Sequence, residues 1–149
     1  MKPHDVSGFF AQEVMVPGLK ARKDLARLCS VIAAWLDYAE REVFRGGCFF
    51  TAVSAEFDSR PGPVKDQVAT CMTEWVDSLA RLVKEAKDLG ELDRRADPRQ
   101  LAWEFNSLAM GANNAYQLQR DPIVFTFARK AIRERLKVYA TEGVRFQLR

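Results

Sequence analysis

Cysteine is the side-chain type in this sequence with the clearest chemical potential, because a thiolate is both a nucleophile and a metal ligand. Cys48 follows Gly46 and Gly47 and precedes an apolar segment, so it stands where a helix would begin. The dipole at a helix N-terminus favours the thiolate, whereas burial among apolar neighbours raises the pKa of a thiol. We expect burial to dominate, so that Cys48 serves packing rather than catalysis.

The other reactive side chains do not form a catalytic pattern. Glu56 and Asp58 flank a turn signal without a companion base, which is typical of solvated carboxylates. His4, the single histidine, stands near the start of the sequence, which argues against most histidine-ligated metal sites and against hydrolases that need a histidine base. A glycine-rich phosphate loop, a CxxC pair and an HExxH motif are all missing from the sequence. We therefore expect neither an enzyme nor a metal or cofactor site.

The elements that position these side chains belong to one expected domain of 149 residues. Hydrophobic residues make up 48% of the sequence, enough for a core, and the net charge of +3 predicts no broad basic surface for nucleic acid. Three cysteines, an odd number, favour a reducing compartment. The sequence has neither a signal-peptide core nor an apolar run near the roughly 20 residues of a membrane span. We expect a cytoplasmic protein without a membrane partner.

Apolar residues recur at helical spacing through almost the whole sequence, which predicts an all-α bundle of about five to six helices. The first expected helix, over 6–16, is stopped by Pro17 and Gly18. It is either a docked N-terminal helix or the end of an element that continues upstream. The further expected helices span 19–44, 48–57, 63–89, 98–119 and 122–140.

The last two expected helices carry more apolar surface than one core needs. Ser107, Gly111 and Ala115 place a small residue at every fourth position, which allows close packing either within the chain or across a two-fold axis. Apolar side chains cover about half of the final helix, wider than the stripe of roughly 100° that packing on one side requires. We therefore expect a homodimer with a four-helix interface. The residues expected there are Trp103, Ser107, Gly111, Asn114, Ala115, Leu118, Phe125, Ala128, Ile132 and Leu136.

Aromatic and methionine side chains are abundant enough to line a cavity for an apolar or aromatic ligand. The same side chains at helical spacing also form ordinary core, so both interpretations stay open. Asn106 and Asn113 fall between the two apolar sides of their helix, and a buried amide needs a partner in a ligand, the same chain or a second subunit. The candidate ligand-binding residues are Trp35, Cys48, Phe49, Met72, Trp75, Phe105, Asn106, Met110 and Asn113.

Several short runs of this sequence resemble one protein family. They are Phe-Arg-Gly-Gly-Cys-Phe-Phe at 44–50, Ala-Glu-Phe-Asp-Ser-Arg-Pro-Gly-Pro-Val at 55–64, Gly-Glu-Leu at 90–92, Asp-Pro at 97–98 with Leu-Ala at 101–102, and Met-Gly-Ala-Asn at 110–113. Together they resemble the C-terminal domain of tetracycline-repressor (TetR/AcrR) transcription regulators, over about 24–136. The resemblance implies an all-helical domain whose last two helices dimerise and whose earlier helices surround a small-molecule pocket.

The resemblance also bears on DNA binding. In the family a helix-turn-helix of about fifty residues precedes this domain and reads an operator in the major groove. No counterpart stands in the sequence, so we expect residues 1–17 to be the end of the connecting helix and expect no DNA binding by this chain alone. The resemblance implies that residues 1–149 form one effector-binding and dimerisation domain that senses an apolar or aromatic molecule. The alternative is a dimeric helical scaffold whose own side chains fill the core.

Overall fold

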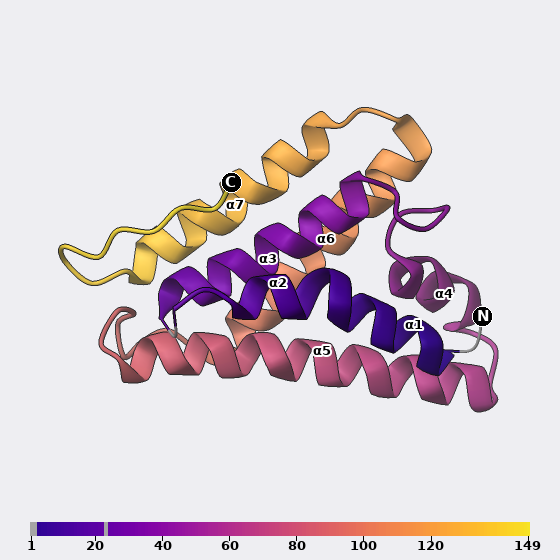
Figure 1. Cartoon of the computed structure of the whole chain (residues 1–149), viewed down its shortest axis with the longest axis horizontal. Helices are drawn as coiled ribbons and strands as arrows, with labels where there is room; N and C mark the ends of the chain where they lie inside the picture. Colours follow the sequence, from indigo (N-terminus) through magenta and orange to yellow (C-terminus); the bar gives the residue numbers. More distant parts are fainter. Residues whose placement is uncertain (1–2, 23) are drawn as a thin grey trace.

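The computed structural model describes residues 3–22 and 24–149, with side chains from Ser7 onward; the side chain of His4 lies outside this part. The described residues form an all-α bundle (Figure 1). The four long helices, α3, α5, α6 and α7, pack around one shared hydrophobic core. The elements are α1 (Pro3–Phe10), the π-helical turn η1 (Ala11–Met15), α2 (Val16–Leu19), α3 (Leu25–Glu40), α4 (Phe49–Phe57), α5 (Pro63–Asp88), α6 (Pro98–Gln119) and α7 (Ile123–Tyr139).

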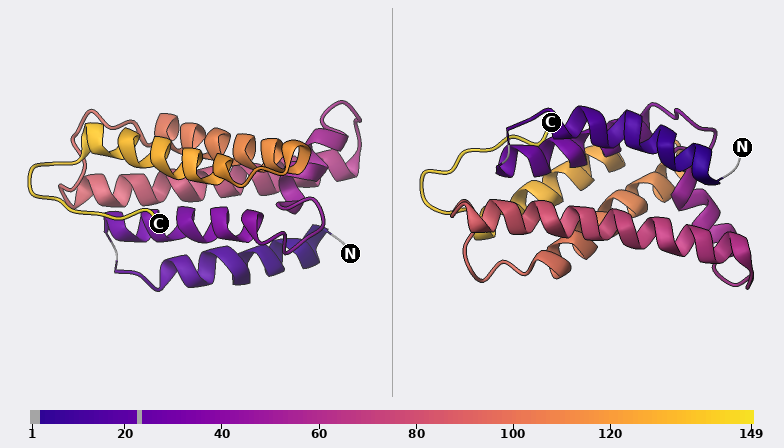
Figure 2. Two further views of the ribbon diagram at one scale, coloured as in Figure 1. Left: turned by 90° about the horizontal axis from the view of Figure 1, so that it is seen from above. Right: turned by 60° about the horizontal axis from the view of Figure 1, so that its bottom comes forward.

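The N-terminal segment is one helical rod, because η1 joins α1 to α2 without a break. The expected stop at Pro17 was wrong. Pro17 has no N–H to donate to the preceding turn, and the wider turn before it, in which the Val16 N–H reaches the Ala11 carbonyl, lets the helix continue to Leu19. Figure 2 shows this rod and α6 on opposite sides of the bundle.

Gly18 brings this rod into direct backbone contact with α3. A Cβ atom at Gly18 would lie 2.5 Å from Val31 Cγ2 and 2.6 Å from Val31 Cα. Both residues are buried. Only glycine therefore allows α2 to lie this close to α3.

Helix α3 is shorter at both ends than the expected helix over 19–44. Asp24 caps its start, because its carboxylate accepts a hydrogen bond from the Ala26 N–H at 2.9 Å. The carboxylate of Glu91 accepts a second one from the Leu25 N–H at 2.7 Å. Glu42, with a φ of 49°, lies in the left-handed region just beyond the end of α3. The bounds of α4 to α7 lie within one residue of the predicted ones.

The final nine residues, 141–149, run back along the bundle beside α7 (Figure 1). The Thr141 N–H donates to the Glu91 carbonyl at 3.0 Å, and Leu148 is buried in the core. Arg129 on α7 donates to the carbonyl of Arg149 at 3.1 Å. Within the described ranges, no helix combines the length and the apolar character that crossing a bilayer requires.

Candidate ligand-binding cavity

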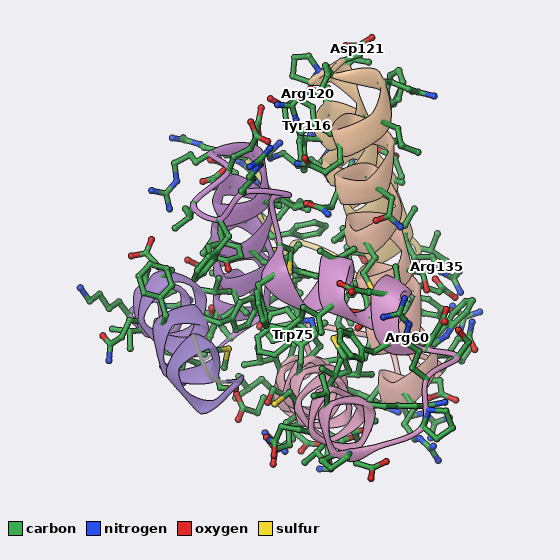
Figure 3. All side chains as sticks on the ribbon, turned by 90° about the vertical axis from the view of Figure 1, so that its right-hand side faces the viewer. Arg60, Trp75, Tyr116, Arg120, Asp121 and Arg135 are labelled. Carbon is green, nitrogen blue, oxygen red and sulfur yellow. The ribbon has the colours of Figure 1, made fainter. Side chains whose placement is uncertain are left out.

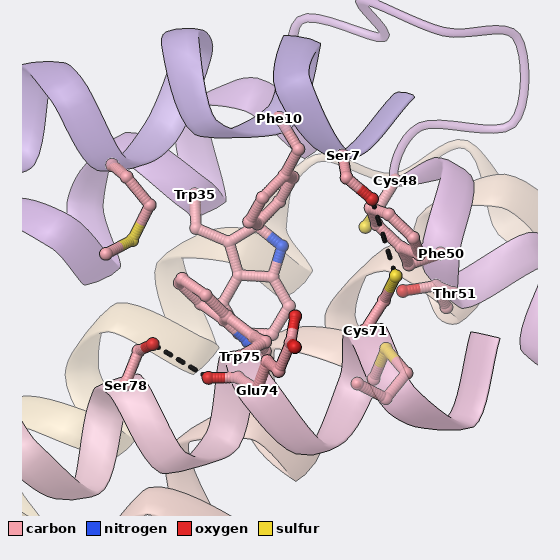
Figure 4. Close-up of a pocket in the computed structure, with 12 residues that line it drawn as sticks. Ser7, Phe10, Trp35, Cys48, Phe50, Thr51, Cys71, Glu74, Trp75 and Ser78 are labelled. Carbon is pink, nitrogen blue, oxygen red and sulfur yellow. Dashed lines mark hydrogen bonds between the residues drawn. The ribbon is translucent and has the colours of Figure 1, made fainter. Parts of the chain in front are cut away.

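A cavity of about 160 Å³ lies where the N-terminal rod meets α3, α4 and α5 (Figure 4). Its volume is close to the roughly 150 Å³ of an apolar cavity that admits benzene, and is below the 300 Å³ or more of sites for drug-sized ligands. The cavity in this conformation therefore fits a group of about one ring. Its lining residues are Ser7, Phe10, Met15, Trp35, Cys48, Phe50, Thr51, Cys71, Met72, Glu74, Trp75 and Ser78.

Aromatic rings from separate helices form the cavity wall. Trp75 projects from α5 into the interior of the bundle (Figure 3). Its ring centroid lies 4.9 Å from that of Trp35 on α3 and 5.1 Å from that of Phe10 on α1, and both pairs are edge-to-face. Phe10 also meets Phe50 of α4 edge-to-face at 5.7 Å. These pairs join α1, α3, α4 and α5 at the cavity, each adding about 1 kcal/mol beyond the burial of its area.

The polar atoms in the wall are mostly hydrogen-bond donors. The indole N–H groups of Trp35 and Trp75 and the hydroxyl of Thr51 are buried, and none of the three has a hydrogen-bond partner among the described residues. Glu74 is the one charged residue among the described lining residues, and it is exposed at the rim. The cavity is therefore built to surround an uncharged group.

The cysteines carry free thiols in packed surroundings. Cys48 is 2% exposed at the start of α4, where it packs into the core and borders the cavity. Cys71 on α5 lies 3.4 Å from the hydroxyl of Ser7 on α1 (Figure 4). Burial raises the pKa of the Cys29 thiol in α3 to about 12. In the described part of the chain, no three His, Cys, Asp or Glu side chains are placed to hold a metal ion.

Four of the nine candidate ligand-binding residues line this cavity: Trp35, Cys48, Met72 and Trp75. The others lie elsewhere. Phe49 packs against the rings of Phe44 and Phe50, and Phe105 is fully buried in the core. Met110 packs against that core and accepts a hydrogen bond at its sulfur from the Asn106 amide, at 3.2 Å.

The two asparagines have different surroundings. Asn113 is buried and accepts a hydrogen bond from the Cys48 N–H at 3.0 Å, so its partner belongs to the same chain. Asn106 lies at a shallow surface groove between α5 and α6, together with Trp103. Neither amide reaches the cavity, because α6 contributes no described residue to its lining.

Sequence reasoning missed the contribution of the N-terminal rod, which supplies Ser7, Phe10 and Met15 to the wall. No feature of the sequence indicated which element the apolar face of this segment packs against. The lining residues of α5, in contrast, could have been predicted from the sequence. Cys71 and Ser78 lie four residues before and three after Trp75, which places all three on one helical face.

Helix α6 presents an exposed stripe on the side away from the rod. Trp103, Gly111, Asn114 and Leu118 are exposed, with Ser107 and Ala115 half-buried beside them. All six belong to the expected dimer interface. On α7, Ile123, Phe127 and Val138 are exposed as well. Arg135 of α7 donates to both carboxylate oxygens of Glu104 on α6, at 2.6 and 3.0 Å, and so joins the two helices beside this stripe.

The four α7 residues assigned to the interface need correction. Phe125, Ala128, Ile132 and Leu136 are buried in the chain's own core, and the first, third and fourth are 0% exposed. A second subunit cannot cover a side chain without exposed surface. The apolar arc of α7 is wide, as expected, but this half of it packs inward and the half with Phe127 faces outward.

The described residues thus form an all-helical bundle with an apolar cavity on one side and an exposed apolar face on α6 and α7. The family model described as tetracyclin repressor-like, C-terminal domain, matches residues 25–132. The chain therefore belongs to this family, as its motifs indicated, and the family is one of transcription regulators rather than enzymes.

A solved structure shows the same fold. A TetR transcriptional regulator from Chloroflexus aurantiacus J-10-FL superposes with a TM-score of 0.81 at 20% sequence identity. The match covers 91% of this chain and 69% of the other. The all-α bundle predicted from the sequence is thereby confirmed. No curated protein sequence matches the chain.

Proposed function

We propose that the chain is the effector-binding domain of a TetR-type transcription regulator and takes a small apolar or aromatic molecule into the cavity beside Trp35 and Trp75. The observation that carries the proposal is the cavity itself, walled by aromatic rings from four helices rather than filled by them. Apolar walls with a few polar groups are typical of small-molecule sites.

The N-terminal rod could couple ligand binding in this cavity to the other domain of a TetR-type regulator. Phe10 packs on Trp75 in the wall, and Gly18 holds the far end of the rod against α3. A ligand that changes the distance between Phe10 and Trp75 would tilt the rod about its contact at Gly18. We assign the rod as the connecting helix whose position an effector shifts, by favouring one of two orientations.

The second part of the proposal is a homodimer through the outer faces of α6 and α7. Trp103 is 61% exposed, Leu118 is 85% exposed and Phe127 is 60% exposed, which is costly for large apolar side chains facing water. A two-fold axis along α6 would pair this face with its own copy, where Gly111 allows close approach. We also place the chain in the cytoplasm, where the free thiols of its cysteines stay reduced.

The test uses the tryptophans as reporters. Trp35 and Trp75 line the cavity, and Trp103 lies outside it. In a Trp103→Phe variant the tryptophan fluorescence therefore comes only from Trp35 and Trp75 in the cavity wall. Toluene and phenol are titrated as ring-sized probes by tryptophan emission, and indole, which emits itself, by thermal unfolding alone; a ligand at a hundred times its Kd should add about 2.7 kcal/mol of stability.

A cavity-filling variant provides the control. Cys71→Phe places a ring in the cavity and should abolish the emission change, whereas Ala69→Phe, at an exposed position of α5, should preserve it. Failure of every probe to change emission or stability would favour the scaffold without a ligand. Native mass spectrometry of the unmodified protein gives the subunit number and any retained small molecule.

A further inference from the structure

We infer that the cavity selects uncharged, ring-sized aromatic compounds that carry a hydrogen-bond-accepting oxygen, and that this oxygen accepts from the hydroxyl of Thr51 and from one of the two indole N–H groups, of Trp35 or Trp75. This inference rests on the proposed function, since it names the chemistry of the ligand that the same cavity takes.

Three donors in one small cavity carry the inference. The side chains of Trp35, Thr51 and Trp75 are 3%, 2% and 8% exposed, and their polar atoms lack a partner in the described structure. An indole N–H can only donate, and a buried donor without an acceptor is costly. Figure 4 shows the three side chains reaching the cavity from α3, α4 and α5. A carbonyl oxygen has two lone pairs and can accept from two of these donors at once.

Thr51, like Ser54 on the same helix, has a buried hydroxyl without a partner in the described structure, whereas the hydroxyls of α5 are bonded. Thr70, Thr73 and Ser78 on α5 each donate to the carbonyl four residues earlier, at 2.7 to 3.0 Å. Thr51 stands in the first turn of α4, and the residue four before it, Gly47, precedes the helix. Its hydroxyl therefore lacks the usual backbone acceptor and is left for a ligand.

The charges around the cavity argue for a neutral ligand. Lys and Arg are missing from its described lining, so a carboxylate ligand would be buried without a counter-charge and near Glu74. A cationic ligand would be attracted by Glu74 at the rim, but deeper in the cavity it would be repelled by the positive ends of two indole N–H dipoles. A neutral acceptor satisfies the donors without a charge to bury.

The experiment compares four planar compounds of nearly equal shape by titration calorimetry with the full chain. They are acetophenone, α-methylstyrene, benzoate and benzamidinium. α-Methylstyrene replaces the carbonyl oxygen by a methylene group, and the other two replace the acetyl group by an anion and a cation. We expect acetophenone to bind about fivefold to tenfold more tightly than α-methylstyrene, the equivalent of one neutral hydrogen bond.

The variant Thr51→Val keeps the shape of the side chain and removes the hydroxyl. It should lower the preference for acetophenone over α-methylstyrene at least about threefold. Thr70→Val is the matched control, because Thr70 is exposed on α5 and bonds to its own backbone; it should leave the preference unchanged.

The other outcomes separate the two proposals. Equal or tighter binding of α-methylstyrene overturns the selection of an acceptor and leaves the cavity as a ligand site. Tightest binding of benzoate or benzamidinium overturns the neutral ligand in the same way. A preference for acetophenone that survives Thr51→Val contradicts the role of Thr51. Binding of none of the four overturns this inference, and failure of the earlier toluene, phenol and indole titrations as well overturns the proposed function.

Discussion

Asn113 in the middle of α6 accepts a hydrogen bond from the backbone N–H of Cys48, 3.0 Å away at the start of α4. The contact needs the glycine beside it. A Cβ at Gly47 would lie 2.1 Å from Asn113 Oδ1, and Gly47 has a φ of 77° that disfavours other residues. Through this pair, α6 positions the turn that carries Cys48 and Thr51 into the cavity wall.

Asn113→Ala should lower the free energy of unfolding by about 1–3 kcal/mol, because the buried Cys48 N–H loses its acceptor. The measurement is urea unfolding followed by circular dichroism. Asn114→Ala, at the exposed neighbouring position, should stay within about 0.5 kcal/mol of the unmodified protein. Equal effects of the two substitutions would contradict the structural role of Asn113.

Gly18→Ala should destabilise the packing of the N-terminal rod on α3, by about 1–3 kcal/mol, because the new methyl group overlaps the backbone of Val31. Gly8→Ala is the matched control within the same rod. A Cβ at Gly8 meets nothing within 4 Å, and alanine favours a helix by up to about 1 kcal/mol over glycine, so this variant should be neutral or more stable. Thermal unfolding of both variants measures the difference, and loss of stability in Gly8→Ala alone would overturn the interpretation.

Glu104 should make the stability depend on pH. The hydrogen bonds from Arg135 hold the pKa of the Glu104 carboxyl below its ordinary value. The unfolded chain then binds the proton more readily, so the pair stabilises the fold above the unfolded pKa of about 4.3, and this contribution is lost as the pH falls through the lower folded value.

Glu104→Gln should accordingly be less stable at pH 7 by about 0.5–1 kcal/mol, a modest figure because the pair is partly exposed. The difference from the unmodified protein should shrink below about pH 4. Urea unfolding between pH 3 and 7 measures it, with Glu142→Gln, at an exposed position beyond α7, as the control. A difference that is constant over this range would exclude the ion pair as its cause.

Phe127→Glu should convert the proposed dimer to a monomer, since it places a charge on the outer apolar face of α7. Leu89→Glu controls for charge and exposure, because Leu89 is 58% exposed and Phe127 is 60% exposed, and Leu89 lies at the end of α5. Sedimentation velocity at micromolar concentration distinguishes the two masses. A monomeric unmodified protein would remove the dimer from the proposal.

Thr51→Val should raise the stability of the ligand-free protein by about 1 kcal/mol, because it removes a buried hydroxyl without a partner. Stability and binding of a carbonyl ligand then change in opposite directions in a single variant. Thr70→Val, which removes a hydroxyl that has a backbone partner, should give no such gain. Thermal unfolding without ligand measures the effect, and a less stable Thr51→Val would indicate that the hydroxyl has a structural partner.

The sequence predicted helix ends where local chemistry fixes them. Asp97 caps α6 through its bonds to Arg99 and Gln100, and α6 spans the predicted residues. The rod was mispredicted because Pro17 stops a helix only where the preceding turn cannot widen.

The inward side of α7 could not be predicted from periodicity, which gives the width of an apolar arc but not the element it faces. Contacts between distant residues decide it. Arg129 of α7 donates to the carboxylate of Asp37 on α3 at 2.6 Å, and Arg135 donates to Glu104 on α6. Because both ion pairs are partly exposed, the burial of Phe125, Ile132 and Leu136 contributes most to fixing the rotation of α7, and the two arginines reinforce it. The cavity depends in the same way on Phe10, whose partners lie far along the chain.

The cavity and the outer face of α6 and α7 draw on separate sets of helices within the described residues. A substitution at Thr51 or Trp35 alters the ligand site without touching the exposed stripe, and a substitution at Leu118 does the reverse. Selection can therefore act on the two surfaces independently. If both surfaces act as proposed, a duplicated gene with this fold could acquire a new ligand in a few mutations while its product still pairs with the ancestral copy, or could change partner while it keeps the old ligand.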